Sequence, residues 1–524
     1  MTVYDYVIIG AGSAGCVLAG RLSQDRAVTV GLVEAGGSDR ALEARIPAAF
    51  PKLFRTKRDW EYYSEPEPGL DDRRIYMPRG KMLGGSSAMN AMLFVRGNAA
   101  DFDGWAKAGA PGWSYDEVLP YFKRMETFTR EQASPLRGTD GPLFVTDHRS
   151  RTGITESLVT AAQEAGLEFN PDYNGQSQEG VGYLQVTQRH GSRWSAADAW
   201  LHPAKARNNL TVHSNTSALR LEVAQGRVTG VWVKGKKGPE LIRARREVIL
   251  SAGAIGSPQL LMLSGIGPSQ NLRDVGIDVV VDNPHVGQHY QDHPFYLLNW
   301  ETSAKGTLAE AQSVKQLLNY LVFSRGLLTS TVAEGTAFLR TNSTLEAPDM
   351  QLHFGAAYFH NHGFDTYPTP AFAIAPTLVA PQSRGQITLR TDSPMDHPAI
   401  IGNHLAEQAD VDAMLAGLEF AREIVARPAL AAVRGKEIHP GSGVTSRADL
   451  IDSLRRETEL IYHPTSTARM GSEGDAVVDP ELRVYGVTGL RVVDASVFPT
   501  VPRGNTNAAT YMVAEKAADL IAGA

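Results

Sequence analysis

The chain has 524 residues, of which 43% are hydrophobic and 21% charged, with a formal net charge of −6 and a pI near 6.2. This length predicts two domains or one elaborated domain, and the charge gives no electrostatic footprint for nucleic acid or an anionic membrane. The single cysteine, Cys16, excludes an intrachain disulfide, a cysteine zinc site and a CxxC redox pair.

No apolar run has the length of about twenty residues that a transmembrane helix needs. The N-terminal segment also lacks the basic and apolar regions of a signal peptide. We therefore expect a cytoplasmic protein with a small-molecule partner and neither nucleic acid nor membrane as a partner. The oligomeric state is left open.

The elements in chain order indicate an α/β protein. A strand at 5–9, a glycine-rich turn at 10–15, a helix to residue 22 and a strand at 28–33 form one βαβ unit. Further on we expect strands at 210–212, 227–234 and 247–250, a helix then a polar loop within 304–348, a strand within 368–381, a helix at 406–426, a strand at 490–493 and a helix at 508–522. Because the last two resemble the first unit, we predict a Rossmann-type domain assembled from discontinuous segments.

Three glycines follow the first strand at the spacing GxGxxG: Gly10, Gly12 and Gly15. The first permits a tight turn, the second lets the backbone approach a pyrophosphate, and the third lets helix and strand pack closely. The pyrophosphate then lies at a helix N-terminus. Glu34, after the second strand, can accept hydrogen bonds from ribose hydroxyls and disfavours the 2′-phosphate of NADP. The pattern predicts a dinucleotide and leaves NAD and FAD open.

Two more segments bear on that choice. Residues 79–90 contain consecutive glycines and serines, and residues 253–267 place small residues around an apolar helix. Both segments resemble the signature patterns of the glucose–methanol–choline (GMC) oxidoreductase family. The resemblance continues at 101–105, 112–115, 383–385, 463–471 and 494–496, so it extends over nearly the whole chain. It implies FAD as the cofactor and an α+β substrate domain with an antiparallel sheet beside the FAD domain.

The resemblance also assigns residues to the cofactor. Besides the three glycines, it implies contacts to FAD from Ser13, Ala14, Glu34, Ala35, Gly84, Gly85, Ser86, Asn90, Ala91, Met92, Leu93, Ala218, Asp494, Ala495, Asn507 and Ala508. Met89 stands where some members carry a histidine bonded to the flavin, so we expect FAD to be held non-covalently. The segment 287–290 departs from the family pattern, with His289 and Tyr290 where members usually have Asn-Leu.

Alcohol oxidation removes a hydroxyl proton and a hydride from one carbon, so a base and a donor to the developing alkoxide are needed. An imidazole suits the proton. By resemblance these groups are His463 and Asn507, far apart in the sequence, and Tyr462 is expected to line the substrate pocket with them. Asn505 is the alternative amide.

Other polar groups predict less. His360 and His362 are placed to share one face of a strand, but no third ligand follows from the spacing, so no metal site is predicted. The chain lacks a GxSxG elbow, which argues against a serine hydrolase. We expect the FAD domain at 1–155, 202–296 and 475–524, and the substrate domain at 156–201 and 297–474.

Within this family, the sequences at 463–467 and 505–507 most resemble those of choline-dehydrogenase-like members and of the hydroxymethylfurfural and aryl-alcohol oxidases. It implies oxidation of a primary, aromatic or furanic alcohol to the aldehyde, with O2 as acceptor and H2O2 as product. Two alternatives stay open: a dehydrogenase that uses a quinone or another carrier, and a non-redox hydroxynitrile lyase. Cys16 is poorly placed for a cysteine-dependent fatty-acid decarboxylase.

Overall fold

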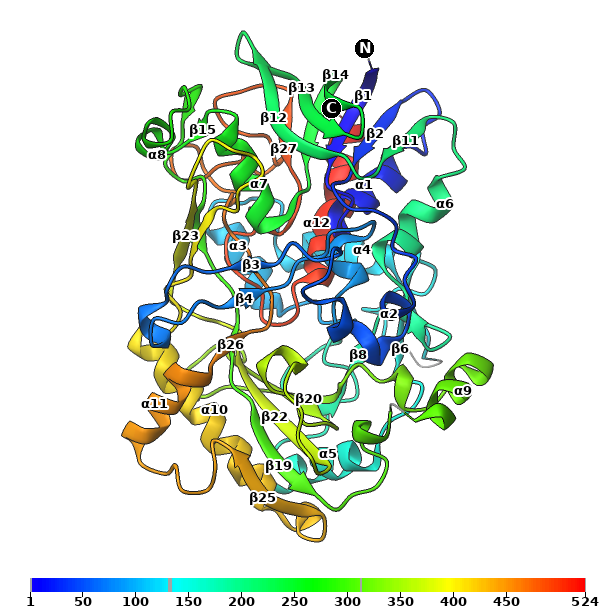
Figure 1. The fold of residues 1–524 in the computed structure, drawn as a ribbon, viewed down its shortest axis with the longest axis vertical. Coiled ribbons are helices and arrows are strands. Elements are labelled where there is room, and N and C mark those ends of the chain that lie inside the picture. The colour runs from blue at the N-terminus through cyan, green and yellow to red at the C-terminus, as the bar shows by residue number, and fades with distance from the viewer. Residues whose placement is uncertain (1, 131–133, 312, 524) are drawn as a thin grey trace.

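The computed structural model describes residues 2–130, 134–311 and 313–523. Two sheets form its two halves, a seven-stranded sheet near both termini and an eight-stranded sheet at the opposite end (Figure 1). Segments from the start, the middle and the end of the chain lie together in the first half, as the blue, green and red ribbons show (Figure 1).

The seven-stranded sheet contains the predicted βαβ unit. In order across the sheet its strands are β11 (Leu210–His213), β2 (Val30–Val33), β1 (Thr2–Ile9), β14 (Gly238–Leu250), β13 (Arg227–Gly235) and β12 (Ser217–Ala224), with β27 (Leu490–Val492) paired to β14. The strands β11, β2, β1, β14 and β27 are parallel, and β12 and β13 are antiparallel. The strand β2 and the last three residues of β1 and of β14 are continuously apolar and buried, as strands covered on both faces require.

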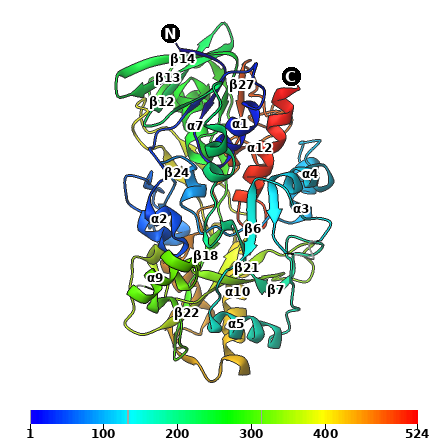
Figure 2. The same ribbon diagram turned by 90° about the vertical axis from the view of Figure 1, so that its right-hand side faces the viewer.

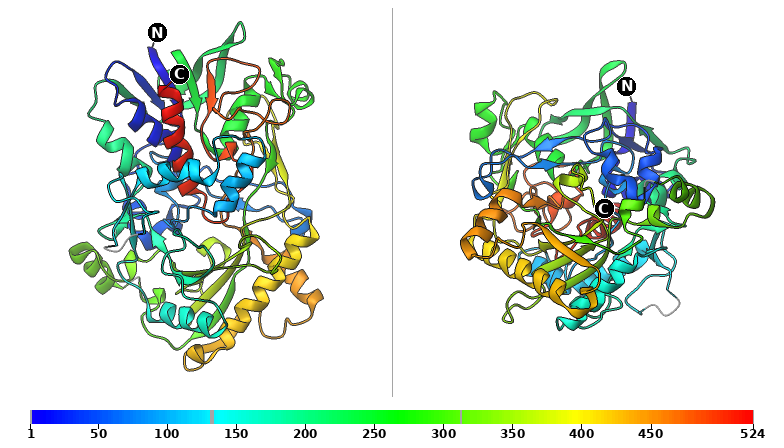
Figure 3. Two further views of the ribbon diagram at one scale, coloured as in Figure 1. Left: turned by 180° about the vertical axis from the view of Figure 1, so that it is seen from behind. Right: turned by 60° about the horizontal axis from the view of Figure 1, so that its bottom comes forward.

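Helix α1 (Ser13–Leu22) packs against the C-terminal helix α12 (Asn507–Ala522) beside this sheet (Figure 2). Arg21 at the end of α1 pairs with Glu515 of α12 at 2.5 Å. Seen from behind, α12 also contacts α4 (Tyr115–Met125) (Figure 3). Helices from the two ends of the chain therefore form one helical layer beside the seven-stranded sheet.

The eight-stranded sheet is antiparallel. Its order is β25 (Arg434–His439), β19 (Leu298–Thr302), β22 (Ala371–Leu378), β21 (Met350–Gly355), β20 (Ala333–Leu339) and β7 (Gly180–Tyr183). The short strand β18 (Pro294–Phe295) also pairs with β22, and β26 (Glu459–Leu460) pairs with β18. The long helix α10 (Gln408–Ala426) and helix α5 (Gly153–Glu164) cover one face of it (Figure 3).

Shorter elements connect and cover the two sheets. They are α2 (Leu42–Arg45), the 3-10 helix η1 (Pro47–Leu53), β3 (Tyr62–Tyr63), β4 (Tyr76–Met77), α3 (Ala99–Lys107), β5 (Glu126–Phe128), β6 (Leu143–Asp147), β8 (Gln185–Val186), β9 (Gln188–Arg189), β10 (Ser192–Arg193), α6 (His202–Ala204), α7 (Gly253–Leu263), β15 (Ile266–Gly267), α8 (Ser269–Asp274), β16 (Val281–Asp282), β17 (Gln288–Tyr290), α9 (Val314–Phe323), β23 (Gly385–Thr388), β24 (Ala399–Ile401) and α11 (Arg447–Glu457).

The predicted fold class is confirmed: a Rossmann-type sheet of discontinuous segments lies beside an antiparallel sheet. One element prediction is wrong, because the polar loop expected before residue 348 contains the buried strand β20. Its small residues lack the apolar alternation of a strand, and pairing with β7 and β21 on both sides decides its conformation. The domain boundaries stay a prediction; β18, at 294–295, already belongs to the antiparallel sheet.

Candidate active site

A cavity of about 420 Å³ is lined by residues of both sheets. At one end it meets Ile9 and Val33, the last residues of the parallel strands β1 and β2. At the other end it meets His353 on β21 and Ala373 on β22. Ligands of open α/β sheets bind beyond the carboxyl ends of the parallel strands, and the first end of this cavity lies there.

The glycine turn after β1 has no room for side chains. Gly10 has a φ of +97°, and a Cβ there would lie 2.4 Å from the carbonyl oxygen of Ser251. A Cβ on Gly15 would lie 1.8 Å from the carbonyl oxygen of Gly10. Gly12 caps α1 without a side-chain hydrogen bond. The first N–H groups of α1 are thus available to a phosphate group.

The second glycine cluster contacts the first. The Gly84 N–H donates to the carbonyl of Ala11 at 2.8 Å, and a Cβ on Gly85 would lie 2.6 Å from the Cα of Gly12. Two segments about seventy residues apart therefore approach each other through bare backbone at the same end of the cavity, which is the close approach that a bound pyrophosphate requires.

Glu34 is buried on the cavity wall after β2. Its carboxylate accepts hydrogen bonds from the N–H groups of Ala11, at 2.8 Å, and Gly36, at 2.7 Å. Burial raises the pKa of this carboxyl to about 7, against the opposing effect of the two N–H donors. The two hydrogen bonds fix the position of this side chain on the cavity wall.

Most of the predicted cofactor residues line this cavity. They are Gly10, Gly12, Ser13, Ala14, Glu34, Ala35, Gly85, Ser86, Asn90, Ala91, Met92, Leu93, Ala218, Asp494, Ala495 and Asn507. Gly15, Gly84 and Ala508 lie behind the wall and do not line it. Met89 also lines the cavity. His289 does not, and it stacks instead on His285.

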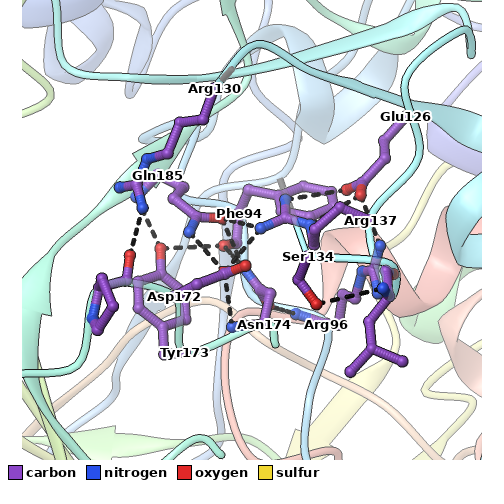
Figure 4. A network of polar contacts seen from close by, with 12 residues as sticks. Phe94, Arg96, Glu126, Arg130, Ser134, Arg137, Asp172, Tyr173, Asn174 and Gln185 are labelled. Atoms are coloured by element: carbon purple, nitrogen blue, oxygen red, sulfur yellow. Dashed lines mark hydrogen bonds and ion pairs between the residues drawn. The ribbon is translucent and has the colours of Figure 1, made fainter. Parts of the chain in front are cut away.

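The segment that leads away from Asn90 and Leu93 is anchored by a buried polar network (Figure 4). The carbonyl of Phe94 accepts from Asn174 Nδ2 at 3.0 Å and from the Tyr173 hydroxyl at 3.2 Å. The N–H of Arg96, two residues on, donates to Asn174 Oδ1 at 2.7 Å.

Glu126 holds the charges of this network together (Figure 4). It accepts from Arg96 Nη2 at 2.5 Å and from Arg137 Nε at 2.8 Å, and all three side chains are almost fully buried. Arg137 also pairs with Asp172 at 2.7 Å. Since unpaired charges at such depth are very costly, each member depends on the others. The network fixes the backbone of the cavity wall.

His463 lies on the cavity wall, held by one hydrogen bond from its backbone and two contacts of its ring. Its N–H donates to Asp292 Oδ1 at 2.7 Å. Its Nδ1 lies 3.0 Å from His293 Nδ1, and its Nε2 lies 3.2 Å from Asn505 Nδ2. An amide nitrogen only donates, so Nε2 accepts and Nδ1 carries the proton that it donates to His293.

The electrostatics favour an unprotonated base. Burial, together with the neighbouring His293 and Arg79, lowers the pKa of His463 well below its ordinary value. Burial also lowers the pKa of His293 to about 3 and raises that of Asp292 to about 7. A neutral imidazole thus lines the cavity, and its unprotonated Nε2, which accepts a hydrogen bond from Asn505, can accept a proton.

The amide that contacts His463 is Asn505, whereas the sequence led us to expect Asn507. Asn507 is the first residue of α12, and its Oδ1 accepts from Ser13 Oγ at 2.6 Å. Asn505 precedes the helix, and among the described residues its Oδ1 is buried without a partner. Helix α12 begins between the two amides, so Asn505 contacts His463 and Asn507 contacts Ser13 of α1.

Tyr462 lines the cavity as expected. Its hydroxyl lies 2.6 Å from His362 Nδ1, and its ring packs edge-on against Phe54 at 5.8 Å between centroids. Aromatic and apolar side chains dominate this part of the wall: Phe50, Phe54, Leu93, Phe295, Leu297, Val332, Phe359 and Ile461.

The histidines at 360 and 362 do not share a strand face, because His362 lies within a 3-10 turn (Asn361–Gly363) that begins directly after His360. His360 Nδ1 contacts Asp365 at 2.7 Å. The fold brings His439 and Glu457 close to His360, a set that the spacing did not reveal. However, the rings of His360 and His439 stack in parallel at 4.4 Å, so their ring lone pairs do not converge on one ion.

Sequence reasoning missed Asp292, His293 and Arg79, because nothing in their local pattern distinguishes them from structural residues. The cavity residues fit FAD: the crowded glycines leave room only for a closely bound ligand. In addition, the hydroxyl of Ser251 and the Oδ1 of Asn505 are buried on the wall without partners among the described residues.

Comparisons with known proteins agree with this site. The model of the GMC oxidoreductase family matches residues 4–295 with its N-terminal domain and residues 381–514 with its C-terminal domain. The chain is 43% identical to an oxygen-dependent choline dehydrogenase of Sinorhizobium fredii, covering 99% of this chain and 95% of that protein. It is 40% identical to an alcohol dehydrogenase [acceptor] of Pseudomonas putida, covering 99% and 96%.

Among solved structures, pyridoxine 4-oxidase from Mesorbium loti superposes with a TM-score of 0.90 at 31% identity, covering 98% of each chain. The chain therefore belongs to the GMC oxidoreductase family, and it is an FAD-binding oxidoreductase that acts on alcohols.

Proposed function

We propose that the chain oxidises a primary alcohol with an aromatic or furanic side chain to the aldehyde, with His463 as the general base. The observation that carries the proposal is the unprotonated Nε2 of His463 beside the amide of Asn505 on the cavity wall. This pairing offers one acceptor for a hydroxyl proton and one donor for the oxygen that remains.

Bound FAD would supply the acceptor for the hydride and the route of electrons to O2. The chain's own residues orient the reactants. The turn at Gly10 and the start of α1 would hold the pyrophosphate, Glu34 would hold the ribose, and Asn90 to Leu93 with Asn507 would hold the ring system. Met89, which lines the cavity and has no imidazole nitrogen to bond the flavin, supports FAD held non-covalently.

The substrate class is inferred from the wall around His463. Phe54, Tyr462, Phe359 and Phe295 offer ring faces and edges on which a flat aromatic alcohol can pack. Pyridoxine, in the name of the similar structure, is such an alcohol. We assign O2 as the acceptor and H2O2 as the product.

A second candidate is a dehydrogenase that passes electrons to a quinone or another carrier, which the name of the Pseudomonas putida relative favours. An aerobic panel of benzylic, furanic, aliphatic and choline-like alcohols, with H2O2 measured against alcohol consumed, tests both functions. We expect benzylic and furanic alcohols to give equal amounts of aldehyde and H2O2. A flavin that stays reduced in air would overturn the oxidase proposal, and a flavin that no alcohol reduces would indicate a lyase.

A further inference from the structure

Helix α9 (Val314–Phe323) exposes its apolar side to solvent, whereas the helices of the core bury theirs. Its apolar side chains face away from the protein and are 40% to 73% exposed: Val314, Leu317, Leu318, Leu321, Val322 and Phe323. These are six of the eleven exposed large hydrophobic side chains among the described residues. The helix lies at the outer edge of the molecule (Figures 1 and 3).

Two polar side chains of α9, Gln316 and Tyr320, are turned toward the protein. The Tyr320 hydroxyl lies 2.9 Å from Ser192 Oγ and is the buried group of the helix. Gln316 Oε1 accepts from the N–H of Leu327 at 3.3 Å. Ser313 caps the helix by accepting from the N–H of Gln316. Because these contacts fix the orientation of α9, its apolar face is presented outward by the fold and does not result from loose packing.

The charged residues of the segment 311–333 are both basic, and the exposed Glu310 directly precedes this segment. Lys315 and Arg325 are exposed on this segment, and no Asp or Glu occurs from 311 to 333. The flanking acids are Glu310 and Glu334, and Glu334 is buried. The chain as a whole has a net charge of −6, so this short basic and apolar segment contrasts with its surroundings.

We propose that α9 docks the protein on an anionic lipid surface, with its apolar face among the acyl chains and the two cations at the headgroups. A helix that combines an exposed apolar face with flanking cations binds the bilayer interface in this manner. Within the described residues no helix is long and apolar enough to cross a bilayer. Our sequence-based expectation of no membrane partner rested on spanning length and overall charge, and neither criterion detects a helix that lies in the interface.

The apolar face of α9 is too small to form a stable interface with a second copy of the chain. At ten residues, α9 is about 15 Å long and about 10 Å wide. Two such faces would bury far less than the roughly 800 Å² per partner that a stable interface needs. A lipid surface sets no such minimum, because it covers a protruding helix from all exposed sides.

The docking helix lies close to the active site. The Tyr320 hydroxyl also contacts the carbonyl of Arg45 at 3.4 Å, and Tyr320 packs with Ile46 and Ala49 at η1. Phe50, the next residue of η1, lines the cavity. Lipid docking therefore places this wall of the cavity near the bilayer, from which an apolar alcohol or a lipid-borne acceptor could be drawn.

The test is flotation of the FAD-loaded protein with vesicles of phosphatidylcholine, with and without added phosphatidylglycerol. We expect binding to the anionic vesicles that weakens with salt. Leu318→Glu with Leu321→Glu should lower the vesicle affinity at least about a hundredfold. Lys315→Gln with Arg325→Gln should lower it about thirtyfold.

Phe169→Glu with Val280→Glu is the matched control, because both side chains are exposed apolar residues outside α9. This double variant should bind like the unchanged protein. Flavin reduction by a soluble benzylic alcohol, measured on every variant, shows that it is folded and keeps the catalytic proposal separate.

Absence of flotation with the unchanged protein, or equal loss in the control, would overturn the proposal. A dimer that the Leu318→Glu, Leu321→Glu variant dissociates, without vesicle binding, would instead assign the face to a second copy.

Discussion

Asn505→Ala tests which amide serves the reaction. Asn505 Nδ2 lies 3.2 Å from His463 Nε2, so an alcohol oxygen that gives its proton to Nε2 is within reach of the same amide. Removal of one donor to a developing oxyanion costs about 2.7–4 kcal/mol, which is about 10²–10³ in rate. We expect a loss of this size in flavin reduction, with FAD still bound, because Asn505 has no contact that supports the glycine turns.

The assay is anaerobic stopped-flow mixing with a benzylic alcohol, followed by the flavin absorbance. Asn507→Ala is the matched control, since Asn507 contacts Ser13 at 2.6 Å and not the base. It should keep the reduction rate within about threefold and release FAD more readily, because a hydrogen bond contributes about 0.5–1.5 kcal/mol. The reverse pattern, a slow Asn507 variant and a normal Asn505 variant, would refute the assignment.

Three further outcomes follow from the site. Because burial lowers the pKa of His463, the unprotonated form of its imidazole is present at neutral pH. The rate of flavin reduction should therefore stay constant from pH 6.5 to 8 and fall only well below pH 6.5. A rate that rises as the pH increases through 7 would contradict this. Glu126→Gln should lower the free energy of unfolding in denaturant by about 3–5 kcal/mol, because it leaves two buried arginines without their carboxylate. The control, Asp147→Asn, breaks the part-exposed pair with Arg130 and should lower it by less than about 1 kcal/mol. Equal losses in the two variants would contradict the stabilising role of the buried network. His362→Ala removes the hydrogen-bond partner of the Tyr462 hydroxyl and should raise KM about three- to tenfold with kcat nearly unchanged. An unchanged KM would show that His362 does not position Tyr462 for substrate binding.

The features predicted correctly from the sequence are those that local spacing determines. The turn at Gly10 has its conformation set within six residues, and the crowded backbone there explains why only glycine fits. Strand and helix periodicity likewise placed β1, α1 and α10. The motif around His463 also led us to a residue that lines the cavity, while its role as the base stays a prediction.

Tertiary packing determines the rest. Asn505 and Asn507 are two residues apart, and only the start of α12 decides which one contacts His463. His293 and Asp292 act through contacts with a histidine far along the chain, which no local pattern encodes. The apolar pattern of α9 predicts an amphipathic helix, but only the structure shows that its apolar face points outward.

The central claim is that His463 removes the hydroxyl proton of an alcohol. Anaerobic mixing of FAD-loaded His463→Ala with a benzylic alcohol tests it most directly. We predict that flavin reduction slows by about two or more orders of magnitude relative to the unchanged protein, the scale of a lost general base, while FAD stays bound. Flavin reduction at the original rate would contradict the claim.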